Sequence, residues 1–548
     1  MRIVQFVHGH PPEFIAGTEK YTQSLSRRLV ERGHTCMVVA GSDQASSRPS
    51  IAVDEDQGVQ VVRLIGLSRR SGFRPVAHDP VAEEMIRWLL DLWRPELAHI
   101  QHWRRLTNTL VAVCREFDIP TVVTLHDQWI ACSRVHRLQL NGTFCDGPAA
   151  PCASCVDRDP WQMRGEIERE LSLRGRALEL ELQWSDHVLV PSQAQKQFLQ
   201  QIASVPAHRL EVVPLGSPVA GKERLDPQRT GFPVTPLRVG YWGYLTAEKG
   251  VHLLLEAAQR LPKDEKIEWH LYGPPVDPVY EMRLYRLALG RPVFFHRNYV
   301  HDDLLPARLD IAVFPSLCHE TYSFVLDEAF QLGLPVVVPN RGALCERVGE
   351  AGLLFNYGDA GDLAEKIEFL LQNPEALARL KRAGMVGKVV SMEEHVVRLE
   401  KIYQEVVDSH KPGPMPEREY RKLLLHQHRK VADRDREIEY LVTEQERAMR
   451  NLKEELRRAL QAVIEKEALL RQAQEAIRER DARLLQAGEA IRERDTRLWQ
   501  AGEAIQETRR SLEVLQGDHA NLRAFLLNLK QSPMFRLQGM LAKLSRRS

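Results

Sequence analysis

The chain has 548 residues, 43% of them hydrophobic, enough to bury the cores of about three or four domains. The chain has 75 lysines and arginines and 74 aspartates and glutamates, so its formal net charge is +1. A nearly neutral chain does not attract nucleic acid through its overall charge, which excludes that mode of binding. No apolar run approaches the roughly 18 residues of a membrane-spanning helix, and eight cysteines are too sparse for a disulfide scaffold. Since the chain also enters an apolar strand directly at Met1, we expect a cytoplasmic protein.

Residues 1–216 predict a first Rossmann-like domain. An apolar strand at 2–7 leads through a glycine-containing loop into a helix in which Tyr21, Leu25 and Leu29 share one face. Further strands are expected at 61–65, 97–100, 121–125, 188–190 and 210–213, with helical patterns between several of them.

Residues 217–410 predict a second Rossmann-like domain after a polar, proline-rich link that ends at Pro236. Strands are expected from Leu237 and at 269–272, 293–295, 311–314 and 335–339, with a helix at 251–260. The two domains would face each other across a cleft, where apposed helix starts can enclose a diphosphate.

The rest of the chain predicts a long helix. After a lead-in at 411–437, residues 438–530 carry a heptad repeat in which eleven apolar residues follow one another seven apart, from Val442 to Leu512. The partner heptad position is weaker and contains charged residues, and a 14-residue duplication lies within the segment. We predict a coiled coil that joins copies of the chain or binds a partner protein; the alternative is a single solvated helix held by Glu–Arg pairs.

The last segment, 531–548, predicts a short basic amphipathic helix. Ser532 and Pro533 can begin it, and four apolar residues share a face flanked by arginine and lysine. The helix could touch an anionic membrane surface at the inner face of the membrane, dock a partner protein, or pack against the coiled coil. Weak, salt-sensitive binding to liposomes is the expected result for the first alternative.

The most informative stretch is residues 311–340, which places Glu320 and Glu328 across a strand-to-helix turn. That is where open α/β sheets bind ligands. Eight helical residues rise roughly 12 Å, so the two carboxylates cannot share one substrate atom but could hold the two ends of an extended ligand such as a sugar nucleotide. The alternative is a pair of ordinary carboxylates favoured near a helix start by its dipole.

The E-x7-E spacing of Glu320 and Glu328, followed by Glu-Ala, Gly-Leu-Pro-Val and Gly342-Ala343-Leu344, resembles the retaining family-4 glycosyltransferases of the GT-B fold over about the first 400 residues. The resemblance implies an α/β protein with two Rossmann-like domains, here followed by the coiled coil. It also implies sugar transfer from a nucleotide-diphosphate donor by front-face displacement, with no cofactor required. In that family the first glutamate lies at the transferred sugar and the second binds the nucleotide ribose.

Residues 241–250 resemble the family's Gly-Arg-Leu…Lys-Gly signature, in which Arg and Lys neutralise the donor diphosphate. Lys249 is kept, but Tyr244 stands where Arg is usual, so one positive charge is missing. We expect Arg297, at the end of the strand at 293–295, to supply the second charge. The alternative for Lys249 is a solvated lysine in a first helical turn, where the helix dipole disfavours it.

Three further positions match the family. Gly17 lies in a loop that resembles the Gly-Gly loop near the donor phosphates, although Ala16 replaces the first glycine and would resist a left-handed backbone. His126 matches the histidine near the donor sugar, and the backbone amides of Ser323 and Phe324 would stabilise the departing diphosphate. The alternative for the loop at Gly17 is an ordinary strand-to-helix loop, and the alternative for His126 is a structural histidine.

A separate group of four cysteines follows His126, namely Cys132, Cys145, Cys152 and Cys155. The terminal C-x-x-C is good ligand spacing, and four thiolates would make a closed structural zinc site. The alternatives are free thiols or one disulfide, because the full spacing fits no standard finger.

Taken together, these features predict a glycosyltransferase that moves a sugar from a nucleotide donor to a glycan or lipid-linked acceptor in surface polysaccharide biosynthesis. Two other functions stay open. One is a non-catalytic coiled-coil scaffold with a degenerate GT-B domain, favoured by Tyr244 and Ala16. The other is a GT-B sugar-nucleotide epimerase, which would be expected to lack the long tail.

Overall fold

The computed structural model describes residues 1–46, 48–67, 79–145, 152–156, 164–218, 236–262, 266–297, 309–384 and 389–411, with short helical pieces between 451 and 466 and at 516–517. The predicted lead-in, coiled coil and terminal basic segment therefore lie almost entirely outside the described residues. Residues Met1–Arg457 form one compact unit and Arg458–Ser548 another. Among the described helices, none combines the length and apolar character needed to cross a bilayer.

The first domain is built on an eight-stranded sheet in the order β3-β4-β2-β1-β5-β6-β7-β8. Every pair of neighbours is parallel except β3 and β4, which form an antiparallel hairpin at the edge. Gln57 and Gly58 both have positive φ at its turn, as a two-residue hairpin requires. The strands are β1 (Arg2–Val7), β2 (Thr35–Gly41), β3 (Ser50–Asp56), β4 (Val59–Ile65), β5 (Leu97–Ile100), β6 (Thr121–Thr124), β7 (His187–Val190) and β8 (Leu210–Val212).

Helices cover both faces of this sheet. Its strand order reverses at β1, so right-handed crossovers place α1 on one face and α2 and α3 on the other. The helices are α1 (Gly17–Glu31), α2 (Pro80–Trp93), α3 (Leu110–Glu116), α4 (Arg164–Trp184) and α5 (Gln193–Ile202), with short 3-10 turns at Cys152–Ser154 and Ala207–Arg209.

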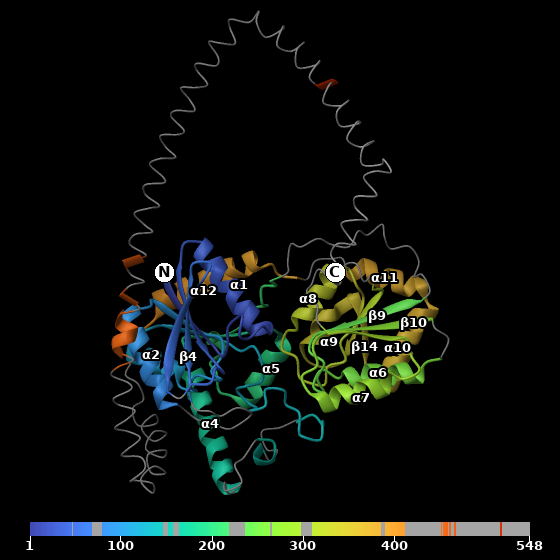
Figure 1. Ribbon diagram of the computed structural model, residues 1–548, viewed down its shortest axis with the longest axis horizontal. Coiled ribbons are helices and arrows are strands. Elements are labelled where there is room, and N and C mark those ends of the chain that lie inside the picture. Colours follow the sequence, from blue (N-terminus) through green and yellow to red (C-terminus); the bar gives the residue numbers. More distant parts are fainter. Residues whose placement is uncertain are drawn as a thin grey trace, which may run out of the picture. The chain divides into compact units, whose positions relative to one another are not determined.

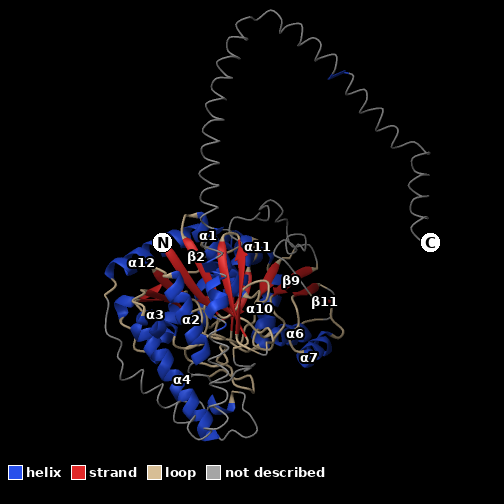
Figure 2. Ribbon diagram, turned by 60° about the vertical axis from the view of Figure 1, so that its left-hand side comes forward, coloured by secondary structure: helices blue, strands red, loops and turns tan. Residues whose placement is uncertain are grey.

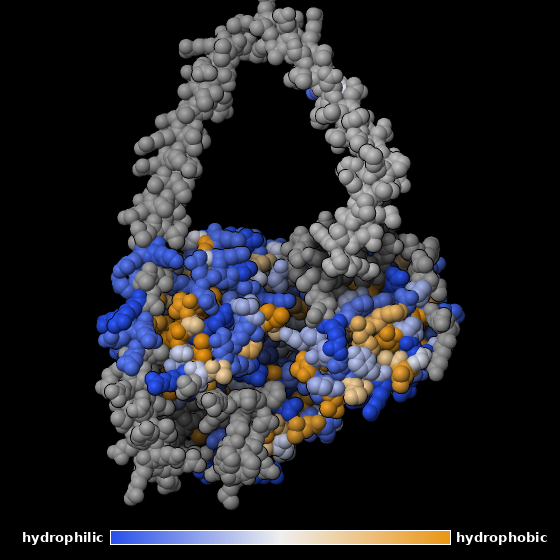
Figure 3. Space-filling view, viewed as in Figure 1, coloured by the Kyte–Doolittle hydropathy of each residue, from blue (hydrophilic) through white to orange (hydrophobic). Residues whose placement is uncertain are grey.

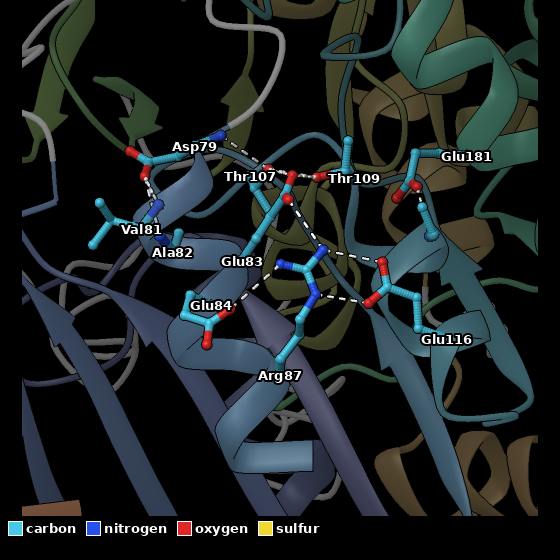
Figure 4. A network of polar contacts seen from close by, with 11 residues as sticks. Asp79, Val81, Ala82, Glu83, Glu84, Arg87, Thr107, Thr109, Glu116 and Glu181 are labelled. Atoms are coloured by element: carbon cyan, nitrogen blue, oxygen red, sulfur yellow. Dashed lines mark hydrogen bonds and ion pairs between the residues drawn. The ribbon is translucent and has the colours of Figure 1, made fainter. Parts of the chain in front are cut away.

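A buried carboxylate locks α2 to the loop before α3 (Figure 4). Glu83 is 3% exposed and accepts hydrogen bonds from Thr107 and Thr109, while Arg87 joins Glu83 to Glu116 on α3. Each of these side chains has a hydrogen-bond or ion-pair partner within the network, so we assign the network a structural role.

The second domain is a six-stranded parallel sheet in the order β11-β10-β9-β12-β13-β14. Both sheets are seen in Figure 2. The strands are β9 (Leu237–Trp242), β10 (Ile267–Tyr272), β11 (Val293–His296), β12 (Ile311–Val313), β13 (Val336–Pro339) and β14 (Gly352–Phe355). The two Rossmann-like domains predicted from the sequence are therefore confirmed.

The second sheet is also packed between helices, and α6 and α7 lie together along one side of it (Figure 1). Apolar side chains of α7 such as Val279 and Met282 remain exposed, and Figure 3 shows hydrophobic residues on this part of the surface. The helices are α6 (Val251–Arg260), α7 (Pro278–Ala288), α8 (Phe324–Gln331), α9 (Gly342–Val348), α10 (Ala360–Gln372) and α11 (Pro374–Gly384), with a 3-10 turn at Gly349–Ala351.

After the second domain, helix α12 (Met392–Ser409) returns to the first and packs beside α1 (Figure 1). Its buried residues Val396, Leu399 and Tyr403 join the hydrophobic core of the first sheet. The Tyr403 hydroxyl lies 2.6 Å from Nδ1 of His99 on β5, and α12 therefore completes the first domain.

Candidate active site

Two loops meet where the neighbouring strands β9 and β12 end. The backbone amides of Leu317 and Cys318 donate to the carbonyl oxygen of Glu248, at 2.9 and 3.0 Å. Gly250 has a φ of +68°, and a Cβ atom there would lie 1.9 Å from the carbonyl oxygen of Pro315. Only glycine fits this close approach, which fixes the two loops against each other.

Lys249 and Glu320 form an ion pair across these loops. The ammonium Nζ lies 2.6 Å from Oε1 of Glu320, which also accepts a hydrogen bond of 2.9 Å from the Ser316 hydroxyl. Burial alone would raise the pKa of Glu320, but the charge of Lys249 and these hydrogen bonds lower it. Burial likewise opposes the charge on Lys249, yet Glu320 raises its pKa. Both groups are therefore charged at neutral pH.

Glu328 is held separately from this pair. Its Oε2 accepts a hydrogen bond of 2.7 Å from the indole nitrogen of Trp242, the last residue of β9. The Trp242 ring in turn packs edge-on against Phe314, with 4.9 Å between centroids. That Glu320 and Glu328 hold the two ends of one ligand stays a prediction.

The turn before α8 is strained. Ser323, at the N-cap position, has a φ of +77°, which a residue with a side chain rarely adopts, and its hydroxyl makes no capping hydrogen bond. Arg347 on α9 supports the turn by donating to the carbonyl oxygens of Tyr322 and Ser323, at 2.8 and 3.1 Å. A glycine at position 323 would adopt this φ without strain.

The starts of α1 and α8 adjoin across the domain boundary. A Cβ atom at Gly17 would lie 3.1 Å from the Phe324 ring, and the rings of Tyr21 and Phe324 are stacked 6.2 Å apart. Ala16 has a φ of −79°, so replacing the first glycine of the loop causes no backbone strain here. Two positive helix ends therefore lie near each other, an arrangement that favours an anion.

His126 lies at the same boundary, just after β6. Its Nε2 is 2.6 Å from Oε1 of Gln101, an oxygen that can only accept, so Nε2 carries the proton. Burial lowers the pKa of His126 to about 3 and keeps the imidazole neutral. The carbonyl oxygen of His126 accepts a hydrogen bond from the Thr321 hydroxyl, which joins the end of β6 to the loop that carries Glu320.

The second positive charge expected from Arg297 is not brought to Lys249 by any contact among the described residues. Strand β10 lies between β9 and β11 in the sheet, so Arg297, which follows β11, is two strands away from the strand that leads to Lys249. The Arg297 side chain is 67% exposed and pairs with Glu281 on α7 at 2.6 Å. Tyr244 is 38% exposed, and its carbonyl oxygen accepts a hydrogen bond from the hydroxyl of Tyr241.

None of the four cysteines predicted to bind zinc forms a disulfide. Among the described residues, which include all four, no group of three or more His, Cys, Asp or Glu side chains is arranged to hold a metal ion. Burial raises the pKa of Cys132 and of Cys152, and the charges of Cys132, Cys145 and Cys155 raise the pKa of Cys152 further. The zinc site stays a prediction.

Sequence reasoning missed two buried pairs at the ends of strands in the first domain. His8, directly after β1, lies 2.9 Å from Glu19, and His102, just after β5, lies 3.1 Å from Asp127. The two imidazole rings are 4.3 Å apart, and burial lowers the pKa of His102 to about 4. The position of His8 and His102 just after predicted strands could have indicated them, because parallel strands present their ligand-binding residues at their carboxyl ends.

Two family models match the chain. Residues 15–219 match Glycosyltransferase Family 4, and residues 236–373 match Glycosyl transferases group 1. Together with the two-sheet fold, these matches identify the α/β part of the chain as a glycosyltransferase of the GT-B type.

Solved structures share the fold at low sequence identity. A sucrose-phosphate synthase from Thermosynechococcus elongatus is 18% identical, with a TM-score of 0.55 over 75% of this chain and 100% of that one. HepE from Anabaena, solved in complex with UDP, is 17% identical, with a TM-score of 0.53 over 74% of this chain and 100% of HepE. WaaG, a glycosyltransferase involved in lipopolysaccharide biosynthesis, is 15% identical, with a TM-score of 0.52 over 75% of this chain and 100% of WaaG.

One curated relative is an exopolysaccharide phosphotransferase of Streptomyces coelicolor. It is 27% identical over 372 residues, which cover 67% of this chain and 36% of the relative. The chain thus spans about a third of the length of the curated relative that it matches.

Proposed function

We propose that this protein is a retaining glycosyltransferase that moves a sugar from a nucleotide-diphosphate sugar to a glycan or lipid-linked acceptor. The observation that carries the proposal is the charged Lys249–Glu320 pair, fixed by Gly250 at the carboxyl ends of β9 and β12. Strand ends of this kind are where open α/β sheets bind their ligands. A sugar bound beside Glu320 would place its phosphate next to the Lys249 ammonium.

In this proposal Lys249 changes partner when the donor binds. The ammonium now bonded to Glu320 would bind the donor diphosphate, and the carboxylate would then accept hydrogen bonds from the sugar. The helix starts at Gly17 and Phe324 would add partial positive charge around the diphosphate. These groups would stabilise the departing diphosphate, so no nucleophile from the protein is needed.

The two other family positions complete the proposed donor site. Glu328 would bind the nucleotide ribose, in competition with its present hydrogen bond from Trp242. His126 would offer its neutral imidazole to the sugar. HepE has been solved with UDP and with UDP-glucose, which supports a nucleotide-sugar donor for this fold.

We place the reaction in surface polysaccharide biosynthesis, because the curated relative is named an exopolysaccharide phosphotransferase and WaaG acts in lipopolysaccharide biosynthesis. Residues 438–530 are proposed to join copies of the chain or to bind a partner protein, and 531–548 to contact an anionic membrane. Light scattering of the full chain, and of a chain that ends near 411, would measure the first effect. Sedimentation with neutral and anionic vesicles would measure the second.

A degenerate domain that serves as a scaffold is the second candidate. It is favoured by Tyr244 in place of a cation and by the backbone strain stored at Ser323. The intact Lys249–Glu320 pair favours the enzyme.

Activity assays distinguish these candidates. Thermal unfolding with UDP, ADP and GDP identifies the base that stabilises the protein, since a ligand that binds only the folded state raises the unfolding temperature. The corresponding sugar nucleotides are then tested for hydrolysis and transfer, with the anomer of the product assigned by NMR. We expect Glu320→Gln to lose turnover while Glu350→Gln, an exposed control in the same domain, keeps it. Near-normal turnover by Glu320→Gln, or an inverted product, would refute the proposal.

A further inference from the structure

The loop that follows His126 is a strained hairpin at residues 132–145. Leu138 and Phe144 form an antiparallel bridge, and the Cys145 amide donates to the Arg137 carbonyl oxygen at 2.8 Å. Val135 and Arg137 have φ values of +60° and +54° and flank His136 on both sides. A β-branched residue with positive φ is a genuine outlier, and such residues persist only where the surroundings hold them.

Contacts within the first domain hold this turn. The Arg137 guanidinium lies over the rings of Phe198 on α5 and Phe144 in the hairpin, 4.0 and 4.9 Å from their centroids. Arg137 also donates to the carbonyl oxygen of Cys145 at 2.6 Å. These contacts hold Arg137, the residue that follows His136.

The second domain holds the other strand of the hairpin. The Phe144 ring packs edge-on against His319 and Tyr357, at 5.9 and 6.0 Å, and the Arg341 guanidinium lies 4.0 Å from its centroid. His319 directly precedes Glu320, so the hairpin is anchored beside the proposed donor site from both domains.

His136 is partly buried at the strained turn of this hairpin, between Val135 and Arg137. The charges of Glu248, Lys249, Asp127 and Glu320 all act on its imidazole, whose pKa is lowered by burial. Its ring makes no hydrogen bond to any of the described residues. A neutral imidazole can both donate and accept a hydrogen bond, which suits a hydroxyl group better than a diphosphate.

We propose that His136 hydrogen-bonds a hydroxyl of the sugar that is transferred, and so helps to determine which sugar the enzyme accepts. The inference rests on the proposed glycosyltransferase function, because it requires a donor sugar beside Glu320. It assigns the cysteine-containing hairpin a role in sugar recognition.

The test compares binding of a nucleoside diphosphate with binding of its sugar conjugate. UDP with UDP-glucose is the first pair, replaced by the ADP or GDP pair if that base stabilises the wild-type protein more. We expect His136→Ala to raise both the Kd and the KM of the sugar nucleotide about tenfold, which is the effect of roughly one lost hydrogen bond. The Kd of the diphosphate alone should stay within about twofold of the wild-type value. His136→Gln, which keeps a donor and an acceptor, should recover part of the loss.

Leu140→Ala is the matched control, because Leu140 lies in the same hairpin and is 67% exposed. It should leave both ligands unaffected. Equal weakening of diphosphate and sugar nucleotide by His136→Ala would indicate a structural role and overturn the inference, as would unchanged binding of both. If the wild-type protein binds and turns over no sugar nucleotide, the proposed function itself fails and the inference falls with it.

Discussion

Gly250→Ala tests whether the contact between the two loops creates the active site. The substitution adds one Cβ atom, which would lie 1.9 Å from the Pro315 carbonyl oxygen. A carbon–oxygen contact needs about 3.3 Å, so the loops would have to separate by about 1.4 Å (3.3 minus 1.9). That displacement is about half the length of the 2.6 Å hydrogen bond that joins Lys249 to Glu320, enough to break it. A misplacement of about 1 Å can cost a hundredfold in rate, and we expect turnover to fall by about that factor.

Backbone strain is a second effect of this substitution and needs its own control. Alanine in a left-handed conformation costs about 1–2 kcal/mol at any site. Gly33, after α1, has a φ of +91° with no atom within 4 Å of an added Cβ, so Gly33→Ala introduces the strain without the clash.

The measurements are sugar-nucleotide turnover and urea unfolding of both variants. Gly33→Ala should lose about 1–2 kcal/mol of unfolding free energy and keep its activity. Gly250→Ala should lose at least as much stability and most of its turnover. If the two variants have the same turnover, the loop contact does not position the catalytic groups and the reasoning is wrong.

Three further outcomes follow from the same site. Ser323→Gly should stabilise the folded protein by about 1 kcal/mol in urea unfolding, because it relieves the positive φ; an unchanged midpoint would contradict this. Tyr244→Arg should tighten binding of the nucleoside diphosphate in calorimetry by restoring the missing cation, and unchanged affinity would count against a diphosphate there. The pKa of Glu320 is lowered in the folded protein, so its ion pair contributes stability above pH 4.5 that is lost as the pH falls further. Glu320→Gln should therefore be less stable than wild type at pH 7, and the difference should shrink below pH 4.5.

Much of the fold could be predicted because apolar runs and helix boundaries are local signals. The predicted strand at 2–7 and helix at 251–260 match β1 and α6. The edge strand β3 was missed, since its sequence SIAVDED is half polar and its pairing with β4 is set by the turn at Gln57 and Gly58. An exposed edge strand gives only a weak hydrophobic pattern.

The candidate site was predictable where a motif names the residue and unpredictable where partners come from distant segments. Glu320 and Lys249 were chosen from their motifs, and the structure joins them. The hydrogen bond between Trp242 and Glu328 depends on how β9 and α8 pack within the second domain. The contact between the hairpin that carries His136 and His319 depends on how the two domains pack. No local pattern encodes either contact. Arg297 does not contact Lys249 because β10 separates β11 from β9 in the sheet, and its exposed side chain pairs with Glu281 instead.

The return of α12 to the first sheet makes the amino-terminal domain discontinuous in sequence. A polypeptide cut anywhere between the two domains would lack Leu399, Ile402 and Tyr403, and the apolar surface that they cover would face water. Such a fragment should aggregate unless α12 is supplied as a separate peptide. The two halves of the enzyme are therefore interdependent for solubility, and dissecting it requires circular permutation or co-expression rather than simple truncation.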